Sequence, residues 1–267
     1  MESNRINFSK QGAMAIITLN RPEARNALSP DMVADLGEAI QSCRSADVRV
    51  VVIGGSGGAF CSGADVKEFV NQLDQGGPDS LSQHLRDLAG ALHRDVILEI
   101  RRLQKPVIAK IDGVAAGAGF SLMLACDLRI ASSNARFLMA YANIGATADG
   151  GSTYLLPRLV GAGKAMDIYL ASQPLSAESA LEMGLVSQVC PAEDLDRHAL
   201  ETAMRLAQGP TLAYGRVKAL FDRSWEADLV SQLDAETEAI SGIGQTSDFQ
   251  EGIRAFADKR SPWFQGR

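Results

Sequence analysis

Asp149 is a carboxylate, a residue type that can do acid–base chemistry. It lies in a stretch of small residues, is followed directly by two glycines, and precedes a predicted helix. A carboxylate in this position has two interpretations. It can act as a general base that takes a proton from a bound substrate, or it can cap the helix that begins near Gly150 by accepting backbone N–H groups. From the residues around Asp149 alone, the capping interpretation is favoured.

Two glycine-rich turns each follow an apolar, strand-like run, at residues 54–58 and 112–119. Neither fits the GxGxxG pattern of dinucleotide-binding proteins, because Phe60 and Leu122 occupy the positions of the third glycine, and neither carries the lysine of a phosphate-binding loop. At a strand-to-helix junction such turns expose free backbone N–H groups that stabilise an oxyanion. For either turn alone, small residues that merely permit a tight turn are the alternative interpretation.

Apolar periodicity and turn residues predict an α/β core followed by a helical region. The segment 74–80 (DQGGPDS) is predicted to be a flexible link, and only helices are expected after Pro191. The chain therefore divides into a core of residues 1–191 and a helical region of residues 192–267. Strands are expected at 14–19, 48–53, 107–111, 128–131 and 136–139, and helices after Ser29 and at 81–103, 120–126, 193–207, 210–225, 229–242 and 246–258.

The composition is that of a globular protein with a weakly acidic surface. Its 267 residues include 26 Lys and Arg against 32 Asp and Glu, a net charge of −6, which argues against a nucleic-acid partner. No run approaches the roughly 20 apolar residues that cross a bilayer, so no membrane association is expected. The four cysteines are far apart and lack metal-ligand spacing, which predicts no disulfide framework, no metal site and a reducing, cytoplasmic location.

Several longer motifs follow one another along most of the chain, from about Met14 to the C-terminus. They are NRPE at 20–23 with NALS at 26–29, FCSGAD at 60–65, KPVIA at 105–109, DGVAAGAG at 112–119 with ACD at 125–127, and ALEMGLV at 180–186. In this order they resemble the motifs of the enoyl-CoA hydratase/isomerase family, the crotonase superfamily. Within it, the pattern is nearest to the single-aspartate isomerases of phenylacetate breakdown.

The resemblance implies an α/β crotonase fold, a spiral of ββα units with two nearly perpendicular sheets and a C-terminal helical trimerisation region. Homotrimers, often paired into hexamers, would then form. The substrate would be an acyl-CoA, with no further cofactor, and the N–H groups of Ala64 and Ala118 would hold its thioester oxygen. Other positions that match substrate-binding residues are Arg25, Ala27, Ser62, Asp65, Val66 and Tyr141, with Phe256 and Lys259 contributed by a neighbouring subunit.

The acid–base set departs from the pattern of the family's hydratases, which carry two glutamates. The matching positions hold Ser121 and Tyr141, neither of which is a carboxylate base, and both are predicted to be pocket wall. Asp149 matches an aspartate that is the base of several isomerases and the nucleophile of 4-chlorobenzoyl-CoA dehalogenase. Isomerisation of an enoyl-CoA double bond by Asp149 is therefore the expected function. The alternatives are an enoyl-CoA hydratase, an Asp-nucleophile hydrolase or dehalogenase, and a non-catalytic crotonase-fold subunit.

The remaining polar residues of interest are given structural roles. Asp65 and Asp127 are predicted to bond turn amides or arginines, and Cys61 has no histidine base that would make it a nucleophile. The three histidines, His84, His93 and His198, are predicted to lie on helix surfaces with no part in the chemistry.

Overall fold

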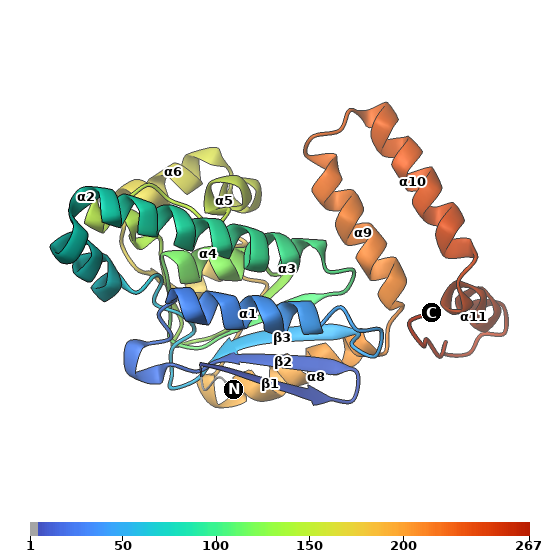
Figure 1. Cartoon of the computed structure of the whole chain (residues 1–267). Coiled ribbons are helices and arrows are strands. Elements are labelled where there is room, and N and C mark those ends of the chain that lie inside the picture. Colours follow the sequence, from blue (N-terminus) through green and yellow to red (C-terminus); the bar gives the residue numbers. More distant parts are fainter. Residues whose placement is uncertain (1–4) are drawn as a thin grey trace.

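A six-stranded sheet forms the centre of the molecule in the computed structural model, which describes residues 5–267 (Figure 1). Its strand order is β1-β2-β3-β4-β6-β9, with β1 and β2 paired as an antiparallel hairpin and every other neighbouring pair parallel. The strands are β1 Ile6–Gln11, β2 Met14–Leu19, β3 Val50–Gly55, β4 Val107–Ile111, β6 Leu128–Ser132 and β9 Gln188–Cys190. Parallel strands of this kind need connections that cross a face of the sheet, and helices supply them.

A second sheet has three short strands in the order β5-β7-β8. These strands belong to the segments that connect the strands of the large sheet. They are β5 Val114–Ala116, β7 Arg136–Leu138 and β8 Leu175–Ser176. The first of them lies only two residues beyond β4, so the chain leaves the large sheet and enters the small one within a single turn. Two sheets built from alternating strands and helices agree with the expected fold.

Helices cover both faces of the large sheet. In Figure 1, α1, α2 and α3 lie on one side of β1–β3 and α8 lies on the other. The inner strands β2 and β3 are accordingly apolar and largely buried, as buried parallel strands are, whereas the edge strand β1 is mostly exposed. The helices are α1 Pro30–Ser42, α2 Val66–Ala91, α3 Leu98–Arg102, α4 Ala118–Ala125, α5 Ser152–Val160, α6 Ala162–Ala171, α7 Ala177–Glu182, α8 Leu195–Ala207, α9 Thr211–Ser224, α10 Leu229–Gly244 and α11 Ser247–Ala257, with a π-helical turn at Leu92–Ile97 and 3-10 turns at Pro22–Ala24, Ala140–Ile144 and Ala192–Asp194.

Helical residues flank Gly77 on both sides within the segment 74–80, so the prediction of a link without helix is wrong, although Gly77 itself is not helical. The segment lies inside α2, which runs on both sides of a kink at Gly77, where φ is +70° and ψ is −167°. Pro78 follows directly, and proline is well suited to the first turn of a helix. The glycine and proline therefore bend a helix that continues, and their composition alone resembles that of a loop.

The helices after residue 191 do not behave as one unit. α8 packs on the large sheet, where Leu195, Ala199 and Ala203 share a buried cluster with residues of β3, β4 and β6. From α9 onwards the chain leaves the sheet, and α9, α10 and α11 form a lobe that stands away from the rest of the molecule (Figure 1). The domain division at residue 191 stays a prediction.

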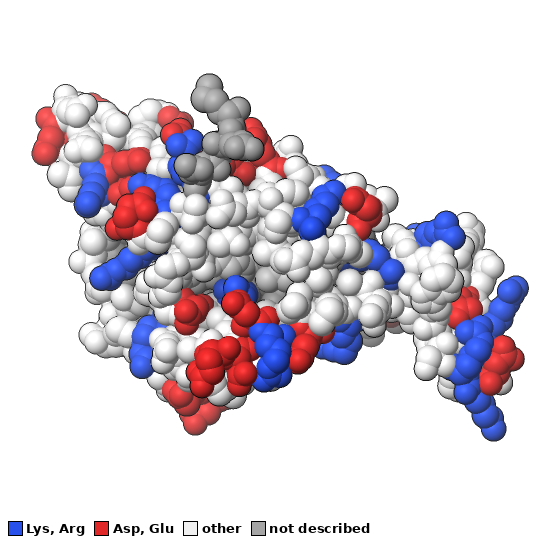
Figure 2. Space-filling model, turned by 90° about the horizontal axis from the view of Figure 1, so that it is seen from below, with Lys and Arg blue, Asp and Glu red and all other residues white. Residues whose placement is uncertain are grey.

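The surface seen from below carries acidic and basic side chains side by side, and much of that face is uncharged (Figure 2). It shows no continuous basic area of the kind that binds nucleic acid. In the part of the chain that the structure describes, no helix is both long and apolar enough to span a bilayer.

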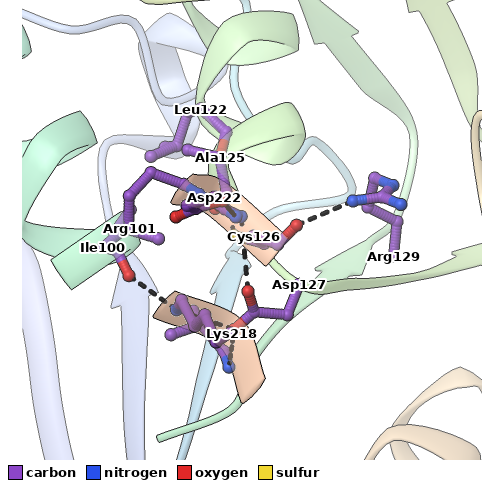
Figure 3. A network of polar contacts seen from close by, with 10 residues as sticks. Ile100, Arg101, Leu122, Ala125, Cys126, Asp127, Arg129, Lys218 and Asp222 are labelled. Atoms are coloured by element: carbon purple, nitrogen blue, oxygen red, sulfur yellow. Dashed lines mark hydrogen bonds and ion pairs between the residues drawn. The ribbon is translucent and has the colours of Figure 1, made fainter. Parts of the chain in front are cut away.

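Charged side chains join the lobe to the core (Figure 3). Lys218 of α9 donates to the Asp127 carboxylate and to the carbonyl of Ile100, both at 2.8 Å. Arg101 contacts the same carboxylate at 3.3 Å and pairs with Asp222 of α9. Burial lowers the pKa of Lys218, so its ammonium group depends on Asp127 as a counter-charge. Asp127 is thus a structural carboxylate, as predicted.

We expect Asp127→Asn to destabilise the protein. The amide keeps the size of the side chain and an oxygen for the Val107 N–H, which Asp127 binds at 2.8 Å, but it leaves the charge of Lys218 unpaired at a side-chain exposure of 7%. Breaking a buried pair from one side costs about 3 kcal/mol. Urea unfolding at fixed protein concentration measures the change.

Two further variants serve as controls for this substitution. Lys218→Met in the Asp127→Asn background removes the second charge and should restore part of the lost stability. Asp167→Asn, at an exposed position of α6, should change little. A loss for Asp127→Asn of less than about 0.5 kcal/mol, the range of ordinary surface substitutions, would contradict the role given to this pair.

Candidate active site

The two glycine-rich segments meet in space. The loop around Cys61 pairs with β5 as a short parallel strand, since the Cys61 N–H donates to the Val114 carbonyl at 3.0 Å and the Ala116 N–H to the Cys61 carbonyl at 2.9 Å. Gly63 then passes close to the start of α4, where a Cβ on it would lie 3.0 Å from the Ala116 oxygen. Its φ of +104° also favours glycine. The close approach of the two turns therefore requires this residue.

Two backbone N–H groups are left without a partner where the turns meet. Neither the Ala64 amide nor the Ala118 amide has a hydrogen-bond acceptor among residues 5–267. Ala118 is the first residue of α4, so its N–H has no partner within the helix. Both residues line one cavity. This pair of free donors can hold a negatively charged oxygen, as the sequence predicted.

The cavity lined by Ala64 and Ala118 has a volume of about 420 Å³, and Asp149 and Tyr141 also line it. Its remaining wall is largely apolar. The other lining side chains come mostly from α1, α2 and the turn at 140–144 and include Val33, Val66, Phe69, Leu85, Leu88, Leu92 and Ile144. A larger cavity of about 870 Å³ lies between α9 and the core, but neither turn lines it. The smaller cavity is therefore the candidate active site.

The carboxylate of Asp149 does not cap a helix. α5 begins at Ser152 with Gly151 at its N-cap position and no side-chain cap, and in the described chain the Asp149 carboxylate accepts no backbone N–H. The capping interpretation is thus wrong. Instead, the Tyr141 hydroxyl donates to Asp149 Oδ1 at 2.6 Å. Asp149 Oδ2 has no such donor, and the side chain is one-third exposed.

Ser121 and Tyr141 both act on Asp149, a relation that the sequence did not reveal. Ser121 Oγ is buried and lies 2.9 Å from both the Asp149 carbonyl oxygen, to which it donates, and the Tyr141 hydroxyl. Burial, reinforced by the neighbouring carboxylate, raises the pKa of Tyr141 well above its usual range. The hydroxyl therefore stays protonated and remains a hydrogen-bond donor. Tyr141 is part of the cavity wall, as predicted, while Ser121 lies behind it.

His93 lies on a helix surface, as predicted, with its side chain 42% exposed, but it also lies beside Asp149. It belongs to the π-helical turn 92–97, and its Nε2 accepts the Gly150 N–H at 3.0 Å. Nε2 also lies 3.8 Å from Asp149 Oδ2, which is longer than the hydrogen bond that it accepts from Gly150. His84 lies 3.8 Å from Glu68, and His198 contacts Gln188.

Most of the predicted substrate-binding residues gather near the first turn. The Ser62 N–H donates to the Arg25 carbonyl at 3.0 Å, and Arg21 joins this segment to the next by binding the Ala27 carbonyl and, at 3.0 Å, the Asp65 carboxylate. Asp65 thus has the structural role given to it in the sequence. Val66 lines the cavity.

Phe256 and Lys259 are not brought to this site within one chain. They lie on or just after α11, at the far end of the C-terminal lobe (Figure 1). Their expected place, next to the site of a neighbouring subunit, stays a prediction.

The thiol of Cys61 has no catalytic environment. Complete burial raises its pKa to about 12, so the thiolate that a nucleophile needs does not form near neutral pH. All four cysteines are buried and unpaired.

Comparison with known proteins was made for the whole chain. Residues 9–267 match the family model for enoyl-CoA hydratase/isomerase. A 1,2-epoxyphenylacetyl-CoA isomerase of Escherichia coli is 36% identical over 97% of both chains, and a short-chain-enoyl-CoA hydratase of Clostridium acetobutylicum is 33% identical, also over 97% of both. The crystal structure of an enoyl-CoA hydratase from Bacillus anthracis superposes with a TM-score of 0.90 at 32% identity, covering 98% of this chain and 100% of that one. Together with the crotonase fold, these matches show that the chain belongs to the enoyl-CoA hydratase/isomerase family.

Proposed function

We propose that this enzyme isomerises the double bond of an enoyl-CoA, with Asp149 as the base. Members of its family act on acyl-CoA by hydration or isomerisation, and one observation favours the second. In the described chain, Asp149 provides the only carboxylate that lines the cavity. A 1,3-proton shift needs one base above one face of the substrate, whereas water addition usually employs a second group that positions water.

The free amides of Ala64 and Ala118 would bind the thioester oxygen. Asp149 takes a proton from C2 of a 3-enoyl thioester, and the electrons left behind spread over the double bond and the oxygen as a dienolate. The two N–H groups stabilise this charge more strongly than that of the neutral substrate, which lowers the barrier. Return of the proton to C4 gives the conjugated 2-enoyl thioester and restores the carboxylate.

The rest of the substrate would follow the two walls of the cavity. The acyl chain meets apolar side chains of α2, such as Phe69, Leu85 and Leu88, which suit an uncharged acyl group. The CoA moiety would pass the segment of Arg25, Ala27 and Ser62 beside the first turn. Buried, unpaired cysteines fit a reducing, cytoplasmic compartment.

Asp149→Asn tests the assignment of the base. The amide keeps an oxygen that accepts the Tyr141 hydroxyl, so folding and CoA affinity should change little. Because an amide cannot take and return a proton, conversion of a 3-enoyl-CoA to its conjugated isomer should fall by about 10²–10⁴-fold. The matched control is Asp167→Asn on exposed α6, which should keep the wild-type rate.

The product of the wild-type reaction distinguishes the alternatives. Conjugated 2-enoyl-CoA without a water adduct supports the isomerase, whereas rapid formation of 3-hydroxyacyl-CoA supports a hydratase. Wild-type speed in Asp149→Asn would mean that the base is another residue. Acyl-CoA binding without turnover, and activity only with a partner protein, would indicate a non-catalytic subunit.

Ala118→Val tests the second oxyanion donor. The branched side chain would displace a thioester that must approach the backbone closely, and loss of one donor typically costs about 10²–10³ in rate. We expect kcat to fall by this factor while CoA binding, measured by calorimetry, weakens far less. Ala171→Val, at the exposed end of α6, controls for the extra methyl groups. Normal turnover in Ala118→Val would show that the donor has been assigned to the wrong residue.

We also propose that the enzyme is a homotrimer or a pair of trimers. The C-terminal lobe leaves large apolar side chains open to solvent, with Phe221 of α9 67% exposed and Phe256 of α11 88% exposed. Trp225, Leu229, Val230 and Trp263 are also exposed. Apolar surface on this scale in a protruding lobe is typical of an interface, and association would bring Phe256 and Lys259 to a neighbour's CoA site.

Light scattering at micromolar concentration measures the assembly directly. We expect a mass of three or six times the 28.4 kDa of one chain, and Phe256→Asp should shift the population toward smaller species. A wild-type monomer would remove both the trimer and the assignment of Phe256 and Lys259 to a neighbouring site.

A further inference from the structure

We propose that His93 is a positioning residue for the catalytic carboxylate, acting through the backbone amide of Gly150. The inference rests on the proposed role of Asp149 as the base. It starts from the peptide unit that joins Asp149 to Gly150. The carbonyl end of this unit accepts from Ser121 Oγ at 2.9 Å and from Ser152 Oγ at 2.7 Å. The N–H end donates to His93 Nε2 at 3.0 Å.

A peptide plane held at both ends cannot rotate about its neighbouring bonds. Gly150 adopts a φ of +60°, and a Cβ on it would lie 2.6 Å from the Ser121 side chain. The Ser121 side chain therefore also packs closely against this turn. Tyr141 restrains the orientation of the Asp149 carboxylate through the 2.6 Å bond to Oδ1. His93 is the group in this set that holds the amide end.

The place of His93 in the chain explains how it reaches Gly150. The helix that leads away from α2 widens to a π-helical turn at 92–97, in which the Leu98 N–H donates to the carbonyl of His93 five residues earlier. Such turns are often found at functional sites, because the extra residue redirects a side chain. The preceding residue, Leu92, lines the cavity, so the turn presents one side chain to the substrate and the next to the Asp149 loop.

Position matters here because the base must meet a carbon atom of the substrate at close range. A displacement of about 1 Å at a reacting group costs on the order of 10²-fold in rate. Without the His93 acceptor, the Gly150 N–H loses its partner and the loop can turn. The loss falls on kcat, since the groups proposed to bind the thioester and CoA belong to other segments.

The test compares two replacements of His93. His93→Gln keeps an acceptor oxygen close to the position of Nε2, whereas His93→Phe keeps the ring shape without an acceptor. For isomerisation of a 3-enoyl-CoA, we expect His93→Phe to lower kcat by about 10–100-fold with KM within about twofold of the wild-type value. His93→Gln should keep kcat within about threefold, because it restores the hydrogen bond.

A purely structural role would not give this pattern. It would lower thermal stability in both variants and would not depend on Asp149. We therefore add the double variant His93→Phe with Asp149→Asn. If His93 acts through Asp149, its replacement causes no further loss once the carboxylate is gone, as groups that work as a unit are non-additive.

Each outcome decides the matter. Four results would overturn the inference: unchanged kcat in His93→Phe, a rise in KM alone, equal losses in His93→Gln and His93→Phe, or additive losses in the double variant. In each case, an inactive Asp149→Asn would still support the proposed function. If His93→Phe does not fold, a folded His93→Gln with more than about a tenfold loss would also overturn it. Full activity in Asp149→Asn would overturn the proposed function, and the role of His93 with it.

Discussion

The contact between the loop at Cys61 and strand β5 is the constraint on which the rest of the site depends. Two backbone hydrogen bonds, at 3.0 and 2.9 Å, lock the end of one strand–loop unit against the start of the next. The pairing forces the chain past Ala116 so closely that Gly63 has no room for a side chain. As a result, the amides of Ala64 and Ala118 face one cavity with no internal partner. Donors fixed by backbone pairing in this way need little reorganisation when charge develops on a bound oxygen.

The second half of the site depends on how one turn of backbone is held. Ser121 and Tyr141 occupy the positions that match the two glutamates of the family's hydratases, and in this chain both hold Asp149, one through its carbonyl and the other through its carboxylate. Under the proposed function, the positions that match the acid and base of the hydratases would here support a single base. The replacement of both glutamates, by Ser121 and Tyr141, is therefore physically linked to the presence of Asp149, because each new hydroxyl binds it.

The sequence predicted the parts of this site that depend on local pattern. Apolar runs placed β2, β3, β4, β6 and β7 but missed the mostly exposed β1 and the short strands β5, β8 and β9. The glycine-rich turns indicated the free amides, and the matching motif position indicated Asp149. Contacts between segments that are far apart in the sequence could not be predicted from local patterns. His93 is a partly exposed residue on a helical turn, and its hydrogen bond to the Gly150 amide joins segments that lie far apart in the sequence. The bond between Tyr141 and Asp149 likewise depends on how two turns pack, which spacing along the chain does not encode.

The orientation of the carboxylate has a consequence for the chemistry. Tyr141 occupies Asp149 Oδ1, and burial keeps the pKa of Tyr141 so high that the hydroxyl donates throughout the working range of pH. Oδ2 is therefore the oxygen left for the substrate. In a 1,3-shift, one oxygen atom takes a proton from one carbon of the flat dienolate and returns it to another carbon on the same face. An oxygen whose carboxylate cannot rotate suits this transfer better than a mobile one. Water addition gains nothing comparable from a single fixed oxygen, because the water and the proton donor must both be placed. The same hydrogen bonds that hold the turn are therefore what the proposed isomerase activity would need.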